Sequence, residues 1–104
     1  MVKLRGINVW PEAVGDIALE IDGVAPDYFV RAVRENNRDE MVVAVVSDRP
    51  PRDFDAIRDA IEARLKDRLG VRIRAEVVAP GALDVFTQAG VAPKLKRFRD
   101  DRNG

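Results

Sequence analysis

The sequence predicts an α+β fold in which two helices pack on one face of a small antiparallel sheet. Three patterns support this prediction: two segments with apolar residues at helical spacing, a continuous apolar run at residues 41–46, and strict alternation at residues 71–77. The 104 residues have the length of a single domain, residues 1–104. We also expect a short N-terminal strand-turn-strand and an irregular, basic C-terminal segment.

The first predicted elements are two short strands and a helix. Residues 2–10 are largely apolar and β-branched on either side of Arg5 and Gly6, which predicts two strand pieces joined by a turn. Pro11 suits the first position of a helix, because its missing N–H would have no partner within the helix. The apolar stripe that follows consists of Val14, Ile17, Ala18 and Ile21. Trp10 is expected to pack against this helix and to anchor it.

A hairpin and a second helix-strand unit come next. Residues 28–34 and 41–46 are predicted strands, and the pair Asn36-Asn37 between them tolerates the left-handed backbone of a tight turn. Residues 53–69 form the clearest predicted helix, which ends at Gly70. Its expected buried stripe consists of Phe54, Ile57, Ile61, Leu65 and Leu69. The alternating segment at residues 71–77 then completes the sheet.

Composition excludes several classes of chemistry. The chain has no His and no Cys, so Ser–His–Asp or Cys–His catalysis and His- or Cys-ligated zinc are impossible, and no metal site is predicted. Lys and Arg total 18 and so do Asp and Glu, so a general attraction to nucleic acid or to a membrane is not expected. A cytoplasmic location fits a chain without Cys.

Two segments carry the candidate functional residues: K-L-R-G-I-N-V-W-P near the start and P-K-L-K-R-F-R-D-D-R near the end. Taken singly, the first is typical of a strand-turn-strand that needs a glycine, and the second of a solvated basic tail or an arm that touches nucleic acid.

Taken together, the two segments resemble the C-terminal domain of phenylacetate–CoA ligase-like enzymes in the adenylate-forming superfamily. R-G-I-N-V-W-P resembles the motif that opens that domain, and K-L-K-R-F-R-D-D-R resembles its closing motif. The stretches G-V-A-P-D-Y-F, L-K-D-R-L-G-V and V-V-A-P-G-A-L continue the resemblance over nearly the whole chain. The chain departs from the family where Pro93, and not Gly, precedes Lys94, and where the loop before Lys94 is longer.

The resemblance implies a role in an ATP-dependent, two-step acid–CoA ligation. It implies that Lys94, with Lys96 as the alternative, stabilises charge during adenylate formation. It also implies a loop that lines the pantetheine channel of coenzyme A and consists of Arg5, Gly6, Ile7 and Asn8. The N-terminal adenylation domain of the same polypeptide would be the partner, with ATP, Mg²⁺, coenzyme A and a carboxylic acid bound by the full-length enzyme. The isolated domain is expected to be inactive, and a homodimeric full-length enzyme is among the expectations.

Two other functions remain open from the sequence. The order of strands and helices is ferredoxin-like, which also fits a standalone regulatory module that binds a small molecule. Nucleic-acid binding would use the basic tail together with Arg72 and Arg74, although the zero net charge disfavours it. Arg31, Arg72 and Arg74 are otherwise expected on a solvated face of the sheet.

Overall fold

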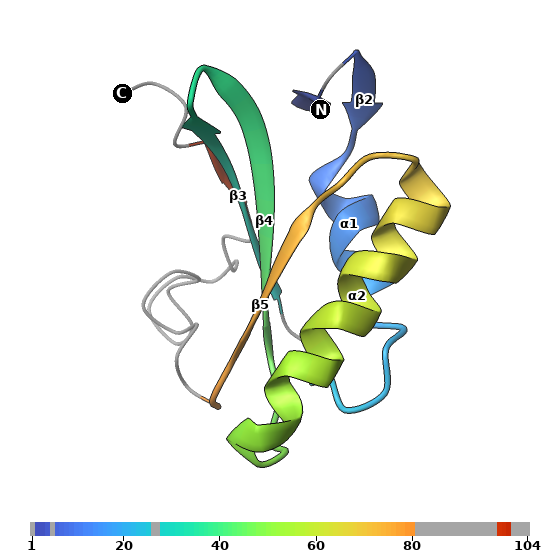
Figure 1. The fold of residues 1–104 in the computed structure, drawn as a ribbon, viewed down its shortest axis with the longest axis vertical. Helices are drawn as coiled ribbons and strands as arrows, with labels where there is room; N and C mark the ends of the chain where they lie inside the picture. The colour runs from blue at the N-terminus through green and yellow to red at the C-terminus, as the bar shows by residue number, and fades with distance from the viewer. Residues whose placement is uncertain (1, 5, 26–27, 81–97, 101–104) are drawn as a thin grey trace, which may run out of the picture.

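The computed structural model describes residues 2–4, 6–25, 28–80 and 98–100. The described elements are two α-helices and two sheets (Figure 1). Along the chain the elements are β1 (Val2–Leu4), β2 (Ile7–Val9), α1 (Pro11–Ala18), β3 (Tyr28–Glu35), β4 (Arg38–Val46), a 3₁₀ turn (Pro51–Asp53), α2 (Phe54–Leu69), β5 (Arg74–Val78) and β6 (Phe98–Asp100). The α+β class and the strand-turn-strand at the N-terminus are therefore confirmed.

The main sheet has four strands in the order β5-β4-β3-β6. Its centre is the predicted hairpin, in which β3 and β4 are antiparallel and Glu35 lies opposite Arg38. The two residues between them, Asn36 and Asn37, have φ of 51° and 63°. A two-residue turn with two positive φ angles matches the twist of the strands that it joins, so the Asn-Asn pair forms the turn that the sequence predicts.

The main sheet is mixed, whereas a purely antiparallel sheet was predicted. β5 is parallel to β4, and β6 is parallel to β3. The cause of the first pairing is α2, which runs back along the sheet, so that β5 enters in the same direction as β4 and beside it. The strands β1 and β2 form a separate antiparallel sheet, so the main sheet consists of β3 to β6.

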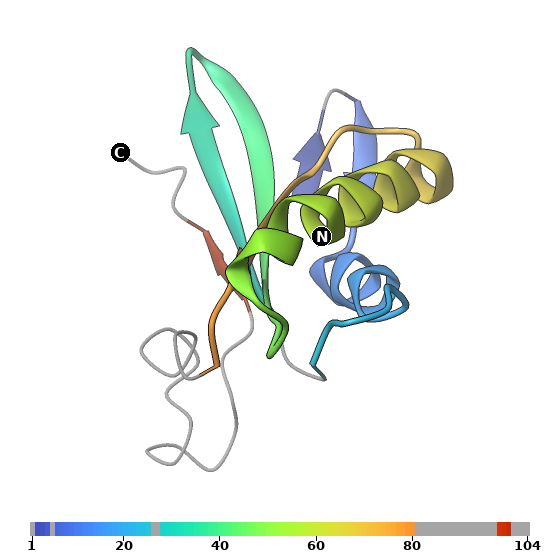
Figure 2. The same cartoon turned by 60° about the horizontal axis from the view of Figure 1, so that its bottom comes forward.

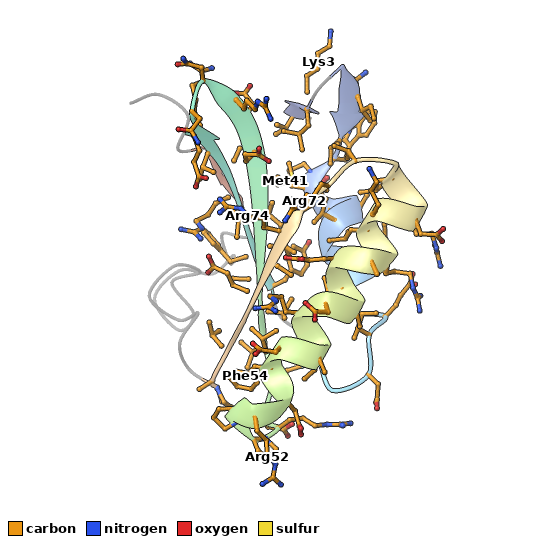
Figure 3. The ribbon with its side chains drawn as sticks, in the orientation of Figure 1. Lys3, Met41, Arg52, Phe54, Arg72 and Arg74 are labelled. Carbon is orange, nitrogen blue, oxygen red and sulfur yellow. The ribbon has the colours of Figure 1, made fainter. Side chains whose placement is uncertain are left out.

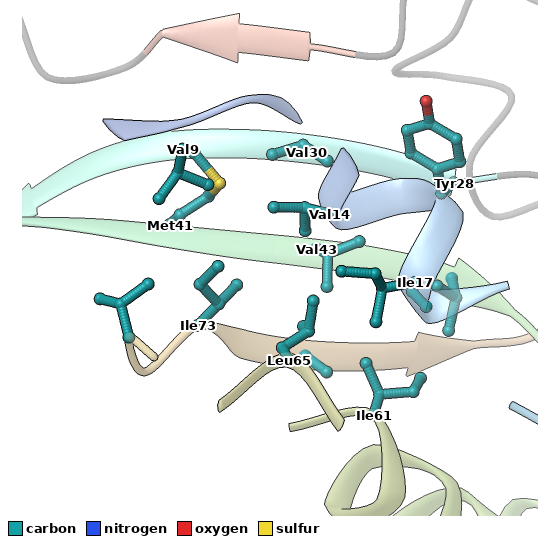
Figure 4. Close-up of a cluster of buried hydrophobic side chains, with 14 of the residues drawn as sticks. Val9, Val14, Ile17, Tyr28, Val30, Met41, Val43, Ile61, Leu65 and Ile73 are labelled. Atoms are coloured by element: carbon teal, nitrogen blue, oxygen red, sulfur yellow. The ribbon is translucent and has the colours of Figure 1, made fainter. Parts of the chain in front are cut away.

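Both helices cover the same face of the main sheet, as predicted (Figure 2). The main core lies between them and the sheet, and Figure 4 shows its centre. Its fully buried side chains come from every layer and include Val14, Val30, Met41, Val43, Ile61, Leu65 and Ile73. The small sheet adds Val2, Leu4 and Val9 to the same core. The β1–β2 hairpin is therefore held by the core of the whole domain.

Helix α2 follows the predicted pattern, with differences at its ends. Ile57, Ile61 and Leu65 are buried, whereas Phe54 and Leu69 at the two ends are half-buried. The helix ends at Gly70, whose φ of 72° is left-handed and whose N–H donates to the carbonyl of Lys66 (2.9 Å). This is the glycine stop that the sequence predicts. After it, Val71 and Ile73 are buried ahead of β5, so the predicted apolar face holds although the strand begins at Arg74.

The outer face of the main sheet carries charged side chains in the middle and apolar ones at one end. Arg31 pairs with Glu76 (2.8 Å) and Arg74 with Glu35 (2.7 Å). A small second cluster on this face consists of Phe29, Ala44 and Val46. Arg31 and Arg74 thus lie on the predicted face, where each has an acidic partner. Among the described residues, no helix combines the length and the apolar character that a membrane span requires.

Candidate functional site

The β1–β2 hairpin holds the part of the predicted site that the structure describes. Leu4 lies opposite Ile7, so the connection between the strands has two residues. Gly6 is in this connection with a φ of 84°, and among the described residues, its chain neighbours aside, no atom lies within 4 Å of the position that a Cβ would take. Glycine is therefore required by the left-handed backbone and not by crowding. Within the described part of the chain, no side chain covers the backbone at Gly6.

The two faces of the hairpin differ. Val2, Leu4 and Val9 point into the core, whereas Lys3 and Asn8, which lie opposite each other in the register, are exposed. Ile7, at the end of the inner face, keeps 38% of its surface exposed. The hairpin thus presents a glycine turn, an amide and an apolar side chain to solvent within three consecutive residues.

Trp10 does not pack as predicted. The residue is 52% exposed, which is the higher value of the two exposed large hydrophobic residues in the described part of the chain. The residue starts α1 through its backbone, because its carbonyl accepts the hydrogen bond from the Val14 N–H (3.2 Å). The prediction that the Trp10 side chain anchors the helix is wrong. Trp10 extends the exposed surface of the hairpin instead.

The remaining predicted site residues, Arg5, Lys94 and Lys96, lie outside the described residues. The structure therefore brings together Gly6, Ile7 and Asn8 and leaves the two lysines as predictions. The chain is described again at β6, which pairs with β3 so that Phe98 lies beside Val30.

Sequence reasoning missed a groove next to the hairpin. Lys3 of β1 and the residues around the β3–β4 turn line a groove of about 540 Å³; the latter are Arg34, Asn37, Arg38 and Asp39. Within it, Arg34 Nε donates to Asp39 Oδ1 (3.0 Å). Figure 3 shows Lys3 at the same end of the molecule as the β3–β4 turn. No spacing in the sequence reveals this group, because only the fold brings Lys3 near residues 34–39.

Other polar clusters offer little chemistry. Among the described residues, no group of three or more His, Cys, Asp or Glu side chains could hold a metal ion. On α2, the hydrogen bond and the charge of Asp59 raise the pKa of Arg58 above its usual value, so this guanidinium stays charged. The described part of the chain thus offers charge and an open backbone, and the chemistry that fits it is binding and electrostatic stabilisation.

Comparison with known proteins decides the family. The sequence model for "AMP-binding enzyme C-terminal domain" matches residues 6–102. This chain belongs to that family. The family match favours a C-terminal domain of an adenylate-forming ligase over a standalone ferredoxin-like regulatory module, and it confirms the resemblance inferred from the sequence.

Individual similar proteins agree with this assignment. The chain is 28% identical over 98 residues to a phenylacetate-coenzyme A ligase of Thermus thermophilus; the match covers 78% of this chain and 22% of that enzyme. A solved domain of phenylacetate-coenzyme A ligase from Bacteroides vulgatus superposes with a TM-score of 0.78 at 27% identity, covering 99% of this chain and 93% of that one. This chain therefore spans about a fifth of the Thermus enzyme and nearly the whole of the Bacteroides domain.

A third similar structure is a 2-hydroxyisobutyryl-CoA ligase solved with 2-HIB-AMP and CoA in its thioesterification state. It superposes with a TM-score of 0.79 at 24% identity and covers 99% of this chain and 21% of that protein. At this identity the likeness establishes that the AMP-binding enzyme C-terminal domain fold is shared.

Proposed function

We propose that this domain is the mobile C-terminal domain of an ATP-dependent carboxylate–CoA ligase of the phenylacetate type. The family match supports the proposal, and the ligase names of the similar proteins point to the same reaction class. The structural observation that carries it is the Gly6 turn. This turn is a left-handed backbone position at the tip of a hairpin that Val2, Leu4 and Val9 anchor in the core.

In the first proposed step a carboxylate oxygen attacks the α-phosphate of ATP, which gives an acyl-adenylate and releases pyrophosphate. Negative charge accumulates on the oxygens between the two reacting groups. Lys94, with Lys96 as the alternative, supplies a cation on a long stem to stabilise that charge. This role follows from the family resemblance of the closing motif.

In the second proposed step the domain turns on its large partner and presents the β1–β2 hairpin to the same active site. The coenzyme A thiol attacks the adenylate carbonyl and AMP leaves. Gly6, with its neighbours Arg5, Ile7 and Asn8, lines the channel for the pantetheine arm, because a residue without a side chain lets this thin chain pass close to the backbone.

The proposal needs a partner domain. The N-terminal adenylation domain of the same polypeptide would bind ATP, Mg²⁺ and the carboxylic acid. The described residues of this domain offer an open turn and exposed cations, which suit coenzyme A, but no cluster for a metal ion. The domain by itself is expected to catalyse neither step.

The test measures the two half-reactions separately in the full-length ligase. Lys94→Ala should lower adenylate formation by about 100-fold or more, the usual cost of removing one group that stabilises a transition-state charge. Transfer to coenzyme A from supplied acyl-adenylate should remain close to wild type. Lys96→Ala tests the alternative lysine, and Lys66→Ala, on the exposed side of α2, is the control. The assignment fails if neither Lys94→Ala nor Lys96→Ala slows adenylate formation.

A further inference from the structure

One edge of the main sheet is open beside α2. β5 is the first strand in the sheet order, and in the described part of the chain β4 is its one neighbour within the sheet. Two grooves of about 380 and 390 Å³ lie along this edge. Arg58 of α2 and Ala75 and Glu76 of β5 line both of them, so the grooves join into one trough. A trough between a helix and the free edge of a sheet can accept a further strand.

Two hydrogen bonds show which backbone groups of β5 face this edge. The N–H of Ser47, directly after β4, donates to the Val78 carbonyl (3.0 Å), so Val78 faces β4. The Ala75 N–H donates to Glu62 Oε2 (3.0 Å) on the opposite side. Because successive residues of a strand alternate in direction, Ala75 and Val77 present their N–H and C=O groups to the free edge. Glu62 takes one of these four groups, and the other three have no hydrogen-bond partner in the described part of the chain.

A second copy of this chain fits this edge better than a strongly charged partner does. Four acidic and three basic side chains line the trough, so its charges nearly balance. The chain as a whole has zero net charge, and a net charge near zero favours association of identical chains. Two identical edges related by a two-fold axis pair antiparallel, because that arrangement gives both copies the same hydrogen bonds.

Three registers place the two-fold axis on an inner residue of β5, at Ala75, Glu76 or Val77. The first register needs the Ala75 N–H, which Glu62 already holds. The second places the Glu76 carboxylates of the two copies directly opposite each other, and like charges in such a pair are destabilising. The third pairs Val77 with the partner's Val77 and Glu76 with the partner's Val78, and it leaves the Glu62 contact in place. The charges and hydrogen bonds therefore favour the register around Val77.

We propose that the free edge of β5 is a homodimer interface in which two copies pair antiparallel around Val77. The Val77 N–H of each copy donates to the Val77 C=O of the other. The N–H of Ala79, which by the same alternation faces the free edge, donates to the partner's Ala75 C=O. On the side of α2, Phe54 and Val77 line the same end of the trough and are covered by the partner (Figure 3). The inference does not depend on the ligase function proposed above.

Hydrogen exchange at increasing protein concentration tests the interface in the 104-residue chain. Exchange at the Val77 amide should slow as the concentration rises from micromolar to millimolar, because dimerisation gives this N–H an acceptor. Exchange at the Ala75 amide should be slow at every concentration, because Glu62 accepts its hydrogen bond within one copy. Sedimentation equilibrium over the same range should show a monomer–dimer equilibrium.

Two substitutions should shift the dimer Kd in opposite directions. Ala79→Pro, at an exposed position after β5, removes the N–H of two symmetric hydrogen bonds and leaves the β4–β5 ladder intact. It should raise the Kd by about 30-fold, since one hydrogen bond typically contributes a factor of about five. Glu62→Ala frees the Ala75 N–H for the partner's Ala79 C=O and should lower the Kd by about tenfold. Glu12→Ala, on the exposed side of α1, removes the same charge elsewhere and should change the Kd by less than about twofold.

Three results would overturn the interface. A monomeric mass and an unchanged Val77 exchange rate up to millimolar concentration would show that a second copy does not bind this edge. A dimer whose Kd responds equally to Ala79→Pro, Glu62→Ala and Glu12→Ala would use another surface. Protection of Val77 in a full-length ligase that sediments as a monomer would identify another segment of the same polypeptide as the occupant. None of these results bears on the half-reactions of the Lys94→Ala variant, so the two proposals fail separately.

Discussion

Gly15 leaves room in α1 for the aromatic ring of Tyr28. A Cβ built on Gly15 would overlap the ring atoms, and Tyr28 itself is buried at the start of β3. Alanine normally favours a helix over glycine by roughly 0.5–1 kcal/mol. Here the contact outweighs that preference, because a well-packed neighbour has no space into which it can move.

We therefore expect Gly15→Ala to lower the free energy of unfolding by about 1–3 kcal/mol, the usual range for overpacking. Urea denaturation measures the change. In a Tyr28→Leu background the same substitution should cost clearly less, because the shorter side chain frees the space. A stabilising effect of Gly15→Ala in the wild-type background would contradict the packing seen in the structure.

Gly6 and Gly70 form a matched pair for testing the hairpin. Both have positive φ, 84° and 72°, and at neither position does a described residue other than the chain neighbours come within 4 Å of a prospective Cβ. Alanine at either position should cost about 1–2 kcal/mol of stability, because L-residues are strained in this conformation. In the full-length ligase, only Gly6→Ala should also slow transfer from acyl-adenylate to coenzyme A. An equal slowing by Gly70→Ala would assign the effect to stability alone.

The sequence predicted the roles of the two turn glycines, but it did not predict those of Gly15 and Trp10. Gly6 and Gly70 were predicted at turns, because glycine next to a break in an apolar pattern signals a left-handed residue. Gly15 gave no such signal, because the side chain that requires a glycine there is the ring of Tyr28, which belongs to a different element. Trp10, directly before Pro11, was predicted to pack against the first helix and anchor it, whereas its exposure depends on where α1 leaves the hairpin.

Glu62 of α2 protects the edge of the main sheet. Its Oε2 accepts a hydrogen bond from the backbone N–H of Ala75 in β5 (3.0 Å). β5 is the first strand in the sheet order, so β4 is its one neighbour within the main sheet. Without Glu62 this N–H would remain available to another strand, which is how edges of sheets promote association.

Glu62→Ala should lower the free energy of unfolding by about 1 kcal/mol, the typical net contribution of one hydrogen bond. It should also speed hydrogen exchange at the Ala75 amide. Glu62→Gln keeps an acceptor oxygen and should retain most of the protection. Equal exchange rates in the two variants would show that the carboxylate does not cover this edge.

The arrangement of the elements was harder to predict than the elements themselves. The apolar run at residues 41–46 and the stripe of Ile57, Ile61 and Leu65 predict β4 and α2 correctly, because periodicity is local, although β4 begins three residues earlier, at Arg38. Whether β5 joins β4 or another strand depends on the length and path of the crossover, which no local pattern specifies. The same limit explains why the groove was missed, since it requires β1 and the β3–β4 turn to meet.

The β1–β2 hairpin and the main sheet share one core, so the whole domain is expected to unfold in one transition. Leu4 of β1 is 1% exposed and belongs to the cluster that includes Ile61, Leu65 and Ile73. Leu4→Ala should cost about 2–5 kcal/mol, the usual range for removing a large core side chain. Asn8→Ala, at an exposed position of the same hairpin, should change stability by less than about 0.5 kcal/mol.

Circular dichroism and tryptophan fluorescence provide the two probes, because Trp10 reports on the hairpin and circular dichroism on the helices. Both should give the same midpoint in urea for wild type and for Leu4→Ala. An earlier fluorescence midpoint would mean that the hairpin opens before the rest of the domain.

Because the β1–β2 hairpin shares its core with α2 and the main sheet, it moves with them as one rigid body. Any rotation of the domain relative to a larger neighbour therefore moves Gly6 and α2 through the same angle, and neither moves independently of the other. A spin label on Lys66, an exposed residue of α2, would therefore trace the path of the glycine tip without touching it. Distances from that label to a reference point on the neighbour would give the successive positions of Gly6 during a catalytic cycle.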